Sequence, residues 1–344
     1  MNNDYLLKVT GLTTIFPTRR GVVKAVDHIH FNVNKDEIVG FVGESGCGKS
    51  VTMLSILRLV PYPGKTIDGE ILFDGEDLLK RSLPDMRRIR GKEIAMIFQD
   101  PMTTLNPVFK VGEQVRESLR IHKIVAGVSE KAVPWYRRHG SGKKAERLRV
   151  LELLEEVGLP APEENYRQYP HELSGGMQQR ALIAIGLSCK PKLLLADEPT
   201  TALDVTIQAQ ILDLLERTMR GRDTSLILVT HDLGVASEFC QRIIVMYAGR
   251  IVEMGPTVDV LKAPKHPYTT GLLKSIPRIT KEKVKIKSIR GTVPDLINLP
   301  HKCAFYPRCE KGSPACEERE MELVEVEKGH WVRCMLYDER TERS

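Results

Sequence analysis

The strongest constraint on this sequence is a glycine-rich segment that lies between an apolar strand and an apolar helix. Residues 43–50 read Gly-Glu-Ser-Gly-Cys-Gly-Lys-Ser and fit the pattern G-x-x-x-x-G-K-[ST]. A β-rich stretch, 37–42, precedes the segment, and apolar residues at helical spacing follow it in 50–60. Glycines let consecutive backbone N–H groups point at phosphate oxygens, while the next helix presents its positive end to the same anion. The segment therefore predicts a nucleotide-phosphate site in an α/β fold.

Two further side-chain groups complete the expected chemistry of this site. Lys49 is predicted to neutralise β/γ-phosphate charge, and Ser50 to give its hydroxyl to Mg²⁺. Downstream, the apolar run 193–196 ends in Asp197 and Glu198. Asp197 is placed to hold the water shell of the metal, and Glu198 to polarise an attacking water. Two adjacent acids alone would cap a turn, but beside a phosphate loop they indicate a catalytic site.

Length and composition exclude several classes of protein. The chain has 344 residues and a formal net charge of +6, which permits anion binding but selects no partner. With 42% hydrophobic and 28% charged residues it is not a disordered polymer, and its length predicts two or more structural units. No stretch approaches the roughly 20 apolar residues that a membrane-spanning helix needs. The first residues lack a secretory pattern, so we expect a cytosolic protein unless a partner holds it at a membrane.

The apolar pattern also predicts how the elements alternate. The stretch 111–188 is mostly helical in pattern, with apolar residues three and four apart in 147–157. The weakly patterned basic stretch 133–144 is predicted to be an exposed loop. Beyond Gly255 the sequence becomes proline-punctuated and lysine-rich, which predicts a domain boundary there. Further strands are expected at 94–98, 193–196, 225–230 and 243–247.

A second anion-binding helix start is predicted at 173–180, which reads Leu-Ser-Gly-Gly-Met-Gln-Gln-Arg. His231 follows another apolar strand, where an imidazole could contact a γ-phosphate, although a lone histidine is usually structural. With the segment 173–180 the sequence resembles the ATP-binding subunits of ABC transporters over about residues 6–255. Met177 departs from the glutamine that many members carry. The resemblance assigns Phe16 to adenine stacking, Gln99 to the Q-loop, 201–204 to the D-loop and His231 to the switch histidine.

The resemblance implies a fold and a complete set of site residues. The fold is a P-loop NTPase (RecA-like) α/β core in residues 1–255, with an antiparallel β subdomain and an inserted helical subdomain at about 102–188. A small cysteine-rich extension follows in 256–344. The implied catalytic residues are Lys49, Gln99, Glu198 and His231, and the implied Mg²⁺ ligands are Ser50, Gln99 and Asp197. The implied ATP-binding residues are Phe16, Gly43, Glu44, Ser45, Gly46, Cys47, Gly48, Lys49, Ser50, Val51, Gln99, Asp197 and His231.

One phosphate loop and one signature in a chain imply a pair of subunits, because in the family the two motifs face different nucleotides. Two ATPase subunits, identical or homologous, are expected to pack head to tail. ATP then favours the closed pair, and hydrolysis releases it. Residues expected to reach the nucleotide of the other subunit are Ser174, Gly175, Gly176 and Asp204.

Four cysteines crowd the end of the chain with the spacing C-x5-C-x6-C-x17-C, at Cys303, Cys309, Cys316 and Cys334. Four thiolates suit Zn²⁺ or an iron–sulfur cluster. The absence of a C-x-x-C pair favours a [4Fe–4S] cluster, while His301 and His330 nearby keep zinc open. Unliganded thiols are the third alternative. A structural role is expected, because a small domain with little apolar material needs a staple.

This tail also resembles the extension of dipeptide/oligopeptide and nickel importer ATPases. The matching stretches are 266–269 with 272–273, then 291–294 and 303–309, and members of that group hold a cluster with four cysteines that match these. The resemblance implies the ATP-hydrolysing subunit of a peptide importer on the cytoplasmic face of a prokaryotic plasma membrane. Its expected partners are two permease subunits, a second ATPase subunit and, indirectly, an extracytoplasmic binding protein. A nickel importer stays open, as does an ABC ATPase that binds nucleic acid through the basic stretch.

Overall fold

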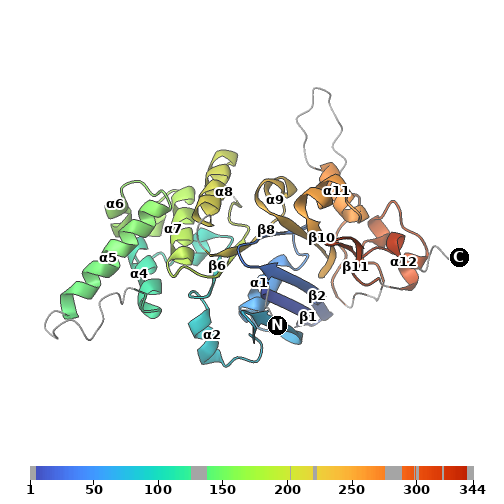
Figure 1. Cartoon of the computed structure of the whole chain (residues 1–344), viewed down its shortest axis with the longest axis horizontal. Coiled ribbons are helices and arrows are strands. Elements are labelled where there is room, and N and C mark those ends of the chain that lie inside the picture. The colour runs from blue at the N-terminus through green and yellow to red at the C-terminus, as the bar shows by residue number, and fades with distance from the viewer. Residues whose placement is uncertain are drawn as a thin grey trace, which may run out of the picture. The chain divides into compact units, whose positions relative to one another are not determined.

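The structure is a computed structural model that describes residues 5–124, 138–201, 203–219, 223–275, 289–297, 299, 302–319 and 321–338 (Figure 1). Its contacts divide the chain into two compact units. The first unit comprises Met1–Arg81 and Ile227–Ser344, and the second comprises Ser82–Leu226. Among the described residues, no helix is both long enough and apolar enough to span a membrane.

An antiparallel sheet occupies the N-terminal part of the first unit. Its strand order is β2-β1-β4-β5, and a turn at Thr18–Gly21 joins β1 to β2. Along β1 and β2, buried apolar side chains such as Leu7, Leu12 and Ile29 interrupt exposed polar ones, as expected for a sheet with one solvated face. The strands are β1 (Tyr5–Thr18), β2 (Gly21–Asn34), β4 (Lys65–Phe73) and β5 (Glu76–Asp77).

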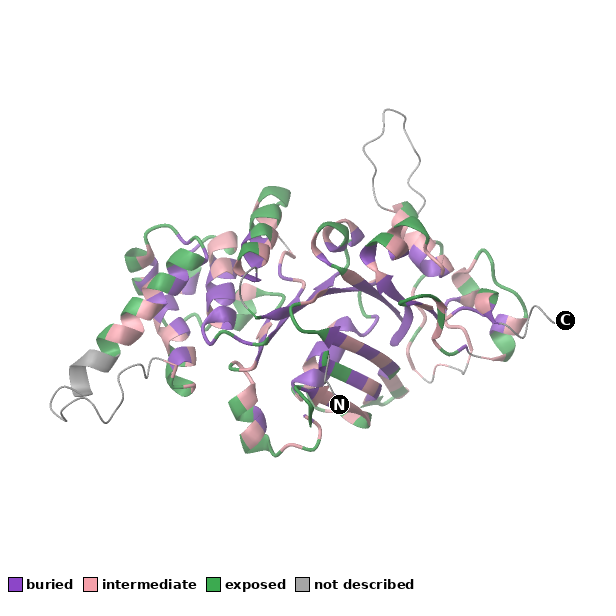
Figure 2. Cartoon of the chain, in the orientation of Figure 1, coloured by how far each residue is buried: buried purple, intermediate pink, exposed green. Residues whose placement is uncertain are grey.

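A second, mixed sheet forms the core of the first unit, with strand order β11-β12-β10-β9-β3-β8. β3 pairs in parallel with β9, whereas β9, β10, β12 and β11 pair antiparallel. The central strands are near-continuous apolar runs that are buried on both faces (Figure 2). The strands are β3 (Ile38–Val42), β8 (Ser225–Thr230), β9 (Arg242–Tyr247), β10 (Arg250–Pro256), β11 (Val324–Glu327) and β12 (His330–Val332). The helices are α1 (Lys49–Ile56), α9 (Leu233–Phe239), α10 (Thr257–Lys262) and α11 (Pro267–Ser275).

The second unit is mostly helical, as the pattern in 111–188 predicts. Its strands β6 (Ile94–Ile97) and β7 (Leu193–Asp197) pair in parallel. The helices are α2 (Leu83–Ile89), α3 (Pro101–Thr104), α4 (Val111–Ile121), α5 (Arg138–Glu156), α6 (Pro162–Arg167), α7 (Gly175–Leu187) and α8 (Val205–Met219).

The expected loop at 133–144 is wrong for part of its length. Residues 138–144 are the first turns of α5, which is longer than its apolar stripe. Residues 138–144 read RHGSGKK and include no large apolar residue, so the sequence shows no apolar stripe at this end of the helix. Residues 133–137 lie outside the described part of the chain.

The described residues from Thr257 onward are here called the C-terminal region. This region joins the mixed sheet through its strand β12, which pairs with β10. The attachment centres on Glu253 of β10, which is fully buried. The Glu253 carboxylate lies 2.8 Å from Nε2 of His330 in β12 and accepts backbone N–H bonds from Lys265 and His266 at 2.7 and 2.9 Å. The predicted boundary at Gly255 falls inside β10, and it stays a prediction. The remaining elements are the 3₁₀ turns Tyr306–Arg308 and Met335–Tyr337 and the helix α12 (Ala315–Glu318).

The stability of the first unit is expected to fall with acid because of His266. Burial lowers the pKa of His266 to about 4 despite the nearby Glu253 carboxylate, and its Nδ1 accepts the N–H of Tyr268 at 3.0 Å. The folded pKa lies below the unfolded value of 6.5, so the stability is fully present above pH 6.5 and is lost as pH falls toward 4. As pH falls from 6.5 to 5, protonation linked to His266 alone should lower the free energy of unfolding by about 2 kcal/mol.

Urea unfolding of wild type and His266→Asn at both pH values checks this expectation. Asparagine keeps an acceptor near the Nδ1 position but does not titrate, so the variant should lose less stability over the interval. Equal pH dependence of the free energy of unfolding in both proteins would contradict the role of His266.

Candidate functional site

The phosphate loop lies in the first unit, between β3 and α1, as its pattern predicts. Three of its glycines have positive φ: +155° at Gly43, +77° at Gly46 and +107° at Gly48. A Cβ at position 43 would lie 2.3 Å from the carbonyl oxygen of Met246, and one at position 48 would lie 2.2 Å from that of Ala25. Both positions therefore require glycine for space as well as for conformation. The loop ends with Gly48 as the N-cap of α1.

Lys49 folds back over this loop. Its Nζ donates to the carbonyl oxygens of Gly43 and Glu44 at 2.7 and 3.1 Å, and its side chain is buried. Ser45 and Gly46 are exposed, and Ser50 and Val51 are half-buried at the start of α1. Cys47 is fully buried, and burial raises the pKa of its thiol even though Lys49 lies beside it. The loop thus has the backbone shape and the cation that a triphosphate needs.

Two other predicted nucleotide residues belong to the first unit. Phe16 is half-buried in β1, and a Cβ at Gly64 would lie 2.5 Å from its ring, so Gly64 leaves that ring room. His231 is exposed directly after β8. The next residue, Asp232, caps α9 by accepting the N–H of Gly234 at 2.7 Å, which fixes the backbone at the histidine.

The remaining catalytic candidates belong to the second unit and meet around Glu198. Asp197 is buried at the end of β7, and Glu198 follows with φ +45°, a left-handed conformation that a side-chain-bearing residue rarely adopts. The Glu198 carboxylate accepts Nε2 of Gln99 at 3.2 Å and the hydroxyl of Thr201 at 2.9 Å. The structure therefore brings Gln99 and Glu198 together, and Thr201 is a second partner of the same carboxylate.

The signature segment opens α7 in the second unit. Ser174 is the N-cap and accepts the N–H of Met177 at 3.4 Å, while Ser174 and Gly175 are exposed and Gly176 is half-buried. Gln178 ties the segment to the preceding turn, because its Nε2 donates to the carbonyl oxygens of Pro170 and Leu173 at 2.8 and 3.1 Å. Asp204, the other residue expected to act across a subunit pair, is exposed at the start of α8. Ser174, Gly175 and Asp204 are therefore accessible to a second molecule.

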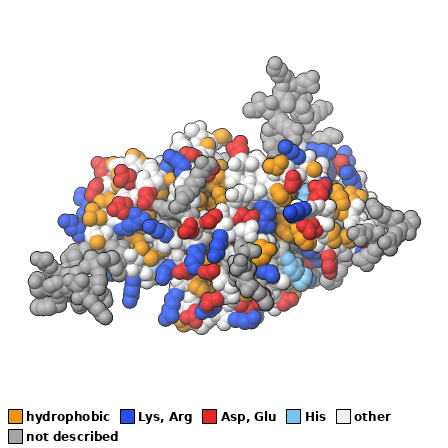
Figure 3. Space-filling view, in the orientation of Figure 1, with side chains coloured by type: hydrophobic (Ala, Val, Ile, Leu, Met, Phe, Trp, Pro, Cys, Tyr) orange, Lys and Arg blue, Asp and Glu red, His pale blue; other side chains and the backbone are white. Residues whose placement is uncertain are grey.

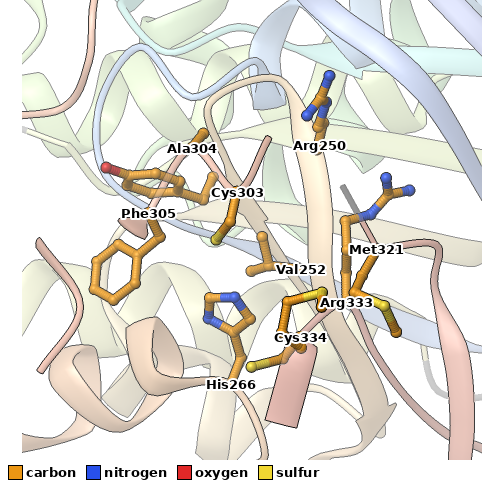
Figure 4. A pocket seen from close by; sticks show the side chains of 11 residues that line it. Arg250, Val252, His266, Cys303, Ala304, Phe305, Met321, Arg333 and Cys334 are labelled. Carbon is orange, nitrogen blue, oxygen red and sulfur yellow. The ribbon is translucent and has the colours of Figure 1, made fainter. Parts of the chain in front are cut away.

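The four C-terminal cysteines all lie in the C-terminal region and carry free thiols. The backbone N–H of Cys303 donates to the carbonyl of Cys316 at 3.1 Å, and Cys316 packs in a small core with Met321 and Met335. Cys303 and Cys334 line one cavity of about 30 Å³ beside Phe305 (Figure 4). Burial raises the pKa of Cys303 and raises that of Cys334 to about 12. Among the described residues, no three metal-ligating side chains gather at metal-binding distances. His301 lies outside them.

One group of contacts to the phosphate loop escapes sequence reasoning. Glu44 is bound by Arg308 and by Tyr268, both of the C-terminal region. The residues are more than 220 positions apart in sequence, and no local pattern links them.

Thr201 should matter for turnover rather than for nucleotide affinity, because its hydroxyl donates to the carboxylate that is predicted to polarise water. We expect Thr201→Val to lower kcat about tenfold and to leave KM for ATP within about twofold. Steady-state ATPase assays at varied ATP measure both constants. Thr201→Ser keeps the hydroxyl and is the matched control. Equal kcat values for the two variants would show that the hydroxyl does not orient Glu198.

Comparison with known proteins agrees with this geometry. Residues 26–201 match the family described as ABC transporter, and residues 252–316 match the oligopeptide/dipeptide transporter C-terminal region. The oligopeptide transport ATP-binding protein AppD of Bacillus subtilis is 48% identical over 97% of both chains. The dipeptide transport ATP-binding protein DppD of Escherichia coli is 42% identical over 96% of both.

Solved structures show the same fold. A dimeric post-hydrolysis structure of the ATP-binding cassette MJ0796, bound to ADP and Pi, superposes with a TM-score of 0.62 at 28% identity, covering 73% of this chain and 98% of that one. The structure of cbiO1 from Clostridium perfringens superposes with a TM-score of 0.59 at 27% identity, covering 76% of this chain and 92% of that one. The predicted α/β nucleotide-binding fold is confirmed. The chain belongs to the ABC transporter family, within the group that carries the oligopeptide/dipeptide transporter C-terminal region.

Proposed function

We propose that this chain is the ATP-binding and ATP-hydrolysing subunit of an ABC importer for dipeptides or oligopeptides. The observation that carries the proposal is the phosphate loop, in which three positive-φ glycines and the buried Lys49 form a triphosphate cradle. Peptide transport is supported by full-length relatives named for oligopeptide and dipeptide transport. The subunit binds permeases at the cytoplasmic face of the inner membrane and pairs with a second ATPase subunit.

The roles of single residues extend this proposal. Phe16 stacks on adenine, and residues 43–51 hold the phosphates, with Ser50, Gln99 and Asp197 serving Mg²⁺. Glu198 polarises the attacking water, and its contacts with Gln99 and Thr201 support that role. The left-handed backbone at Glu198 adds support, because strained conformations concentrate at functional sites.

The signature residues are proposed to act on the nucleotide of the second ATPase subunit. Ser174 and Gly175 are exposed at the N-terminus of the 13-residue helix α7, where backbone N–H groups favour an anion. Asp204 is exposed as well, as a residue at a subunit contact would be in a single chain. Dimeric cassettes among the structural relatives support the pairing of two ATPase subunits.

The permeases are proposed to dock next to Gln99 in the second unit. The segment after Gln99 exposes large apolar side chains, with Met102 75%, Val108 71% and Phe109 56% exposed. Apolar side chains clustered in one exposed segment are typical of a protein interface. Because Gln99 contacts Glu198, movement of this segment would reach the carboxylate that activates water.

The other two predicted functions are less well supported. No relative named above is a nickel transport protein, and none is named for nucleic acid. The face shown in Figure 3 intersperses acidic and basic side chains instead of presenting one basic surface.

The C-terminal cysteines are proposed to hold a [4Fe–4S] cluster, with Zn²⁺ as the alternative. The support is the donor set, since four thiols lie in one small region with a core of a few residues. Their chemistry fits either group, whereas the described arrangement gathers no three ligands at metal-binding distances. Cys303, Cys309, Cys316 and Cys334 would therefore have to draw closer, and the bound group would staple the region.

The Glu198→Gln variant should bind ATP normally and nearly stop turnover in the complex with permeases. Glutamine keeps the size of the side chain but cannot polarise water as a carboxylate does, so a loss of about 10²-fold or more is expected. ATP binding and phosphate release are measured on the same preparation. Glu238→Gln, an exposed acid in α9, is the control and should behave as wild type. Normal ATPase activity in Glu198→Gln would contradict the assignment.

Metal analysis of anaerobically purified protein tests the cysteine proposal. About four iron and four sulfide per chain, with broad absorbance near 400 nm, is the expected result. One zinc without iron would select the alternative. Loss of the metal in Cys316→Ser, but not in Cys189→Ser outside the region, should accompany either result. Metal-free wild-type protein would overturn both.

A further inference from the structure

The phosphate loop is bound from outside by an arginine of the C-terminal region. The guanidinium of Arg308 donates two hydrogen bonds to the Glu44 carboxylate, from Nη1 at 2.7 Å and from Nη2 at 2.9 Å. The arginine side chain is 5% exposed and the glutamate side chain is 29% exposed. A bidentate, largely buried pair of this kind fixes direction as well as distance. Glu44 is the second residue of the loop, so the pair restrains the loop itself.

A second contact restrains the backbone at the same residue. The N–H of Glu44 donates to the hydroxyl of Tyr268 at 2.8 Å, and Tyr268 of α11 is fully buried. The carbonyl of Glu44 accepts Nζ of Lys49 at 3.1 Å. The side chain, N–H and carbonyl of Glu44 are therefore all bound, and the C-terminal region binds two of these three groups, the side chain and the N–H.

Arg308 is in turn held by its own surroundings. Its Nε donates to the carbonyl of Arg290 at 2.8 Å, and Nη1 lies 3.3 Å from the hydroxyl of Tyr247. Its guanidinium lies over the rings of Tyr247 and Phe305, at 5.7 and 5.9 Å from their centroids. Phe305 and Tyr268 pack against each other with centroids 5.4 Å apart. The two residues that bind Glu44 thus belong to one aromatic cluster.

This cluster is continuous with the cysteine segment. Arg308 lies between Cys303 and Cys309, in a turn where the N–H of Tyr306 donates to Cys303 and that of Cys309 donates to Tyr306, both at 3.1 Å. Phe305 lines the cavity that Cys303 and Cys334 also line (Figure 4). A change in the conformation of this turn would move the guanidinium that binds the phosphate loop.

We propose that Arg308 and Tyr268 are positioning residues for nucleotide binding, which hold Glu44 so that the loop N–H groups stay aimed at the phosphates. The inference rests on the proposed ATP binding and extends it, because it makes the affinity for nucleotide depend on the C-terminal region. Neither residue needs to touch ATP. Preorganisation is the physical reason, since a loop that is already in its bound shape loses less entropy on binding.

The test measures the Kd for ATP of the full-length chain by titration calorimetry. One titration is made in EDTA, where ATP is not hydrolysed, and a second is made with Mg²⁺. Arg308→Gln should raise the Kd for ATP about tenfold, in the range that coupled neighbouring groups show. Arg308→Lys keeps the charge but loses the bidentate geometry, so its Kd for ATP should lie between that of wild type and that of Arg308→Gln. In the complex with permeases, KM should rise with Kd while kcat stays within about twofold.

A double-mutant cycle distinguishes the contact from general damage. In a Glu44→Gln background, Arg308→Gln should have little further effect on Kd, because its partner is already changed. Arg319→Gln is the matched control, since Arg319 pairs with Asp338 elsewhere in the C-terminal region. The control should lower the melting temperature without changing Kd. Additive effects in the cycle, or an unchanged Kd in Arg308→Gln, would overturn the proposal.

Tyr268→Phe keeps the test open if Arg308→Gln does not fold. It retains the buried ring and removes only the hydroxyl that accepts the Glu44 N–H, and a rise in Kd of about threefold is expected. An unchanged Kd in this variant would also count against the proposal. If wild type itself binds no ATP, the proposed function fails. If wild type binds and the variants bind equally well, only the positioning role fails.

Discussion

The rest of the first unit depends on how closely the phosphate loop packs against its neighbours. Gly43 lies against the carbonyl of Met246 in β9, and Gly48 against that of Ala25 in β2. Neither position has room for a Cβ. The loop therefore makes close backbone contact with both the antiparallel sheet and the mixed sheet. Between these sheets, Arg250 of β10 binds the buried Asp27 of β2 at 2.6 and 2.8 Å. Burial alone would raise the pKa of Asp27, but the positive charges of Arg250 and Lys24 hold this pKa below its usual value.

Local patterns were enough to predict the parts of the site that lie on single elements. The sequence predicts the strands before Lys49, Glu198 and His231 to within a residue or two, because each is a short apolar run that ends at a glycine or a polar residue. The signature was predictable for a similar reason, since a serine followed by two glycines favours a helix start. By contrast, the N-terminal end of α5 carries no apolar stripe, and the loop expected there is a helix.

Contacts between distant segments could not be predicted. The pair of Arg308 and Glu44 spans 264 positions, and each residue alone reads as an ordinary surface charge. Thr201 bonds to Glu198 only three residues away, but that bond depends on the left-handed backbone at Glu198, which no propensity favours. The cysteine spacing predicts ligand chemistry, whereas the positions of Cys303 and Cys316 depend on packing around Met321 and Met335.

The attachment of β12 to β10 has a consequence for how this chain can be divided. Glu253 sits in the interior of β10, and all the partners described for its carboxylate come from residues after that strand. A chain cut after Pro256 would leave the Glu253 carboxyl group without any of these partners. The cut would also expose the hydrogen-bonding edge of β10, and an exposed strand edge can pair with a strand of another molecule. The C-terminal region is therefore no detachable appendage, and exchanging it between related transporters would require the recipient strand to be redesigned with it.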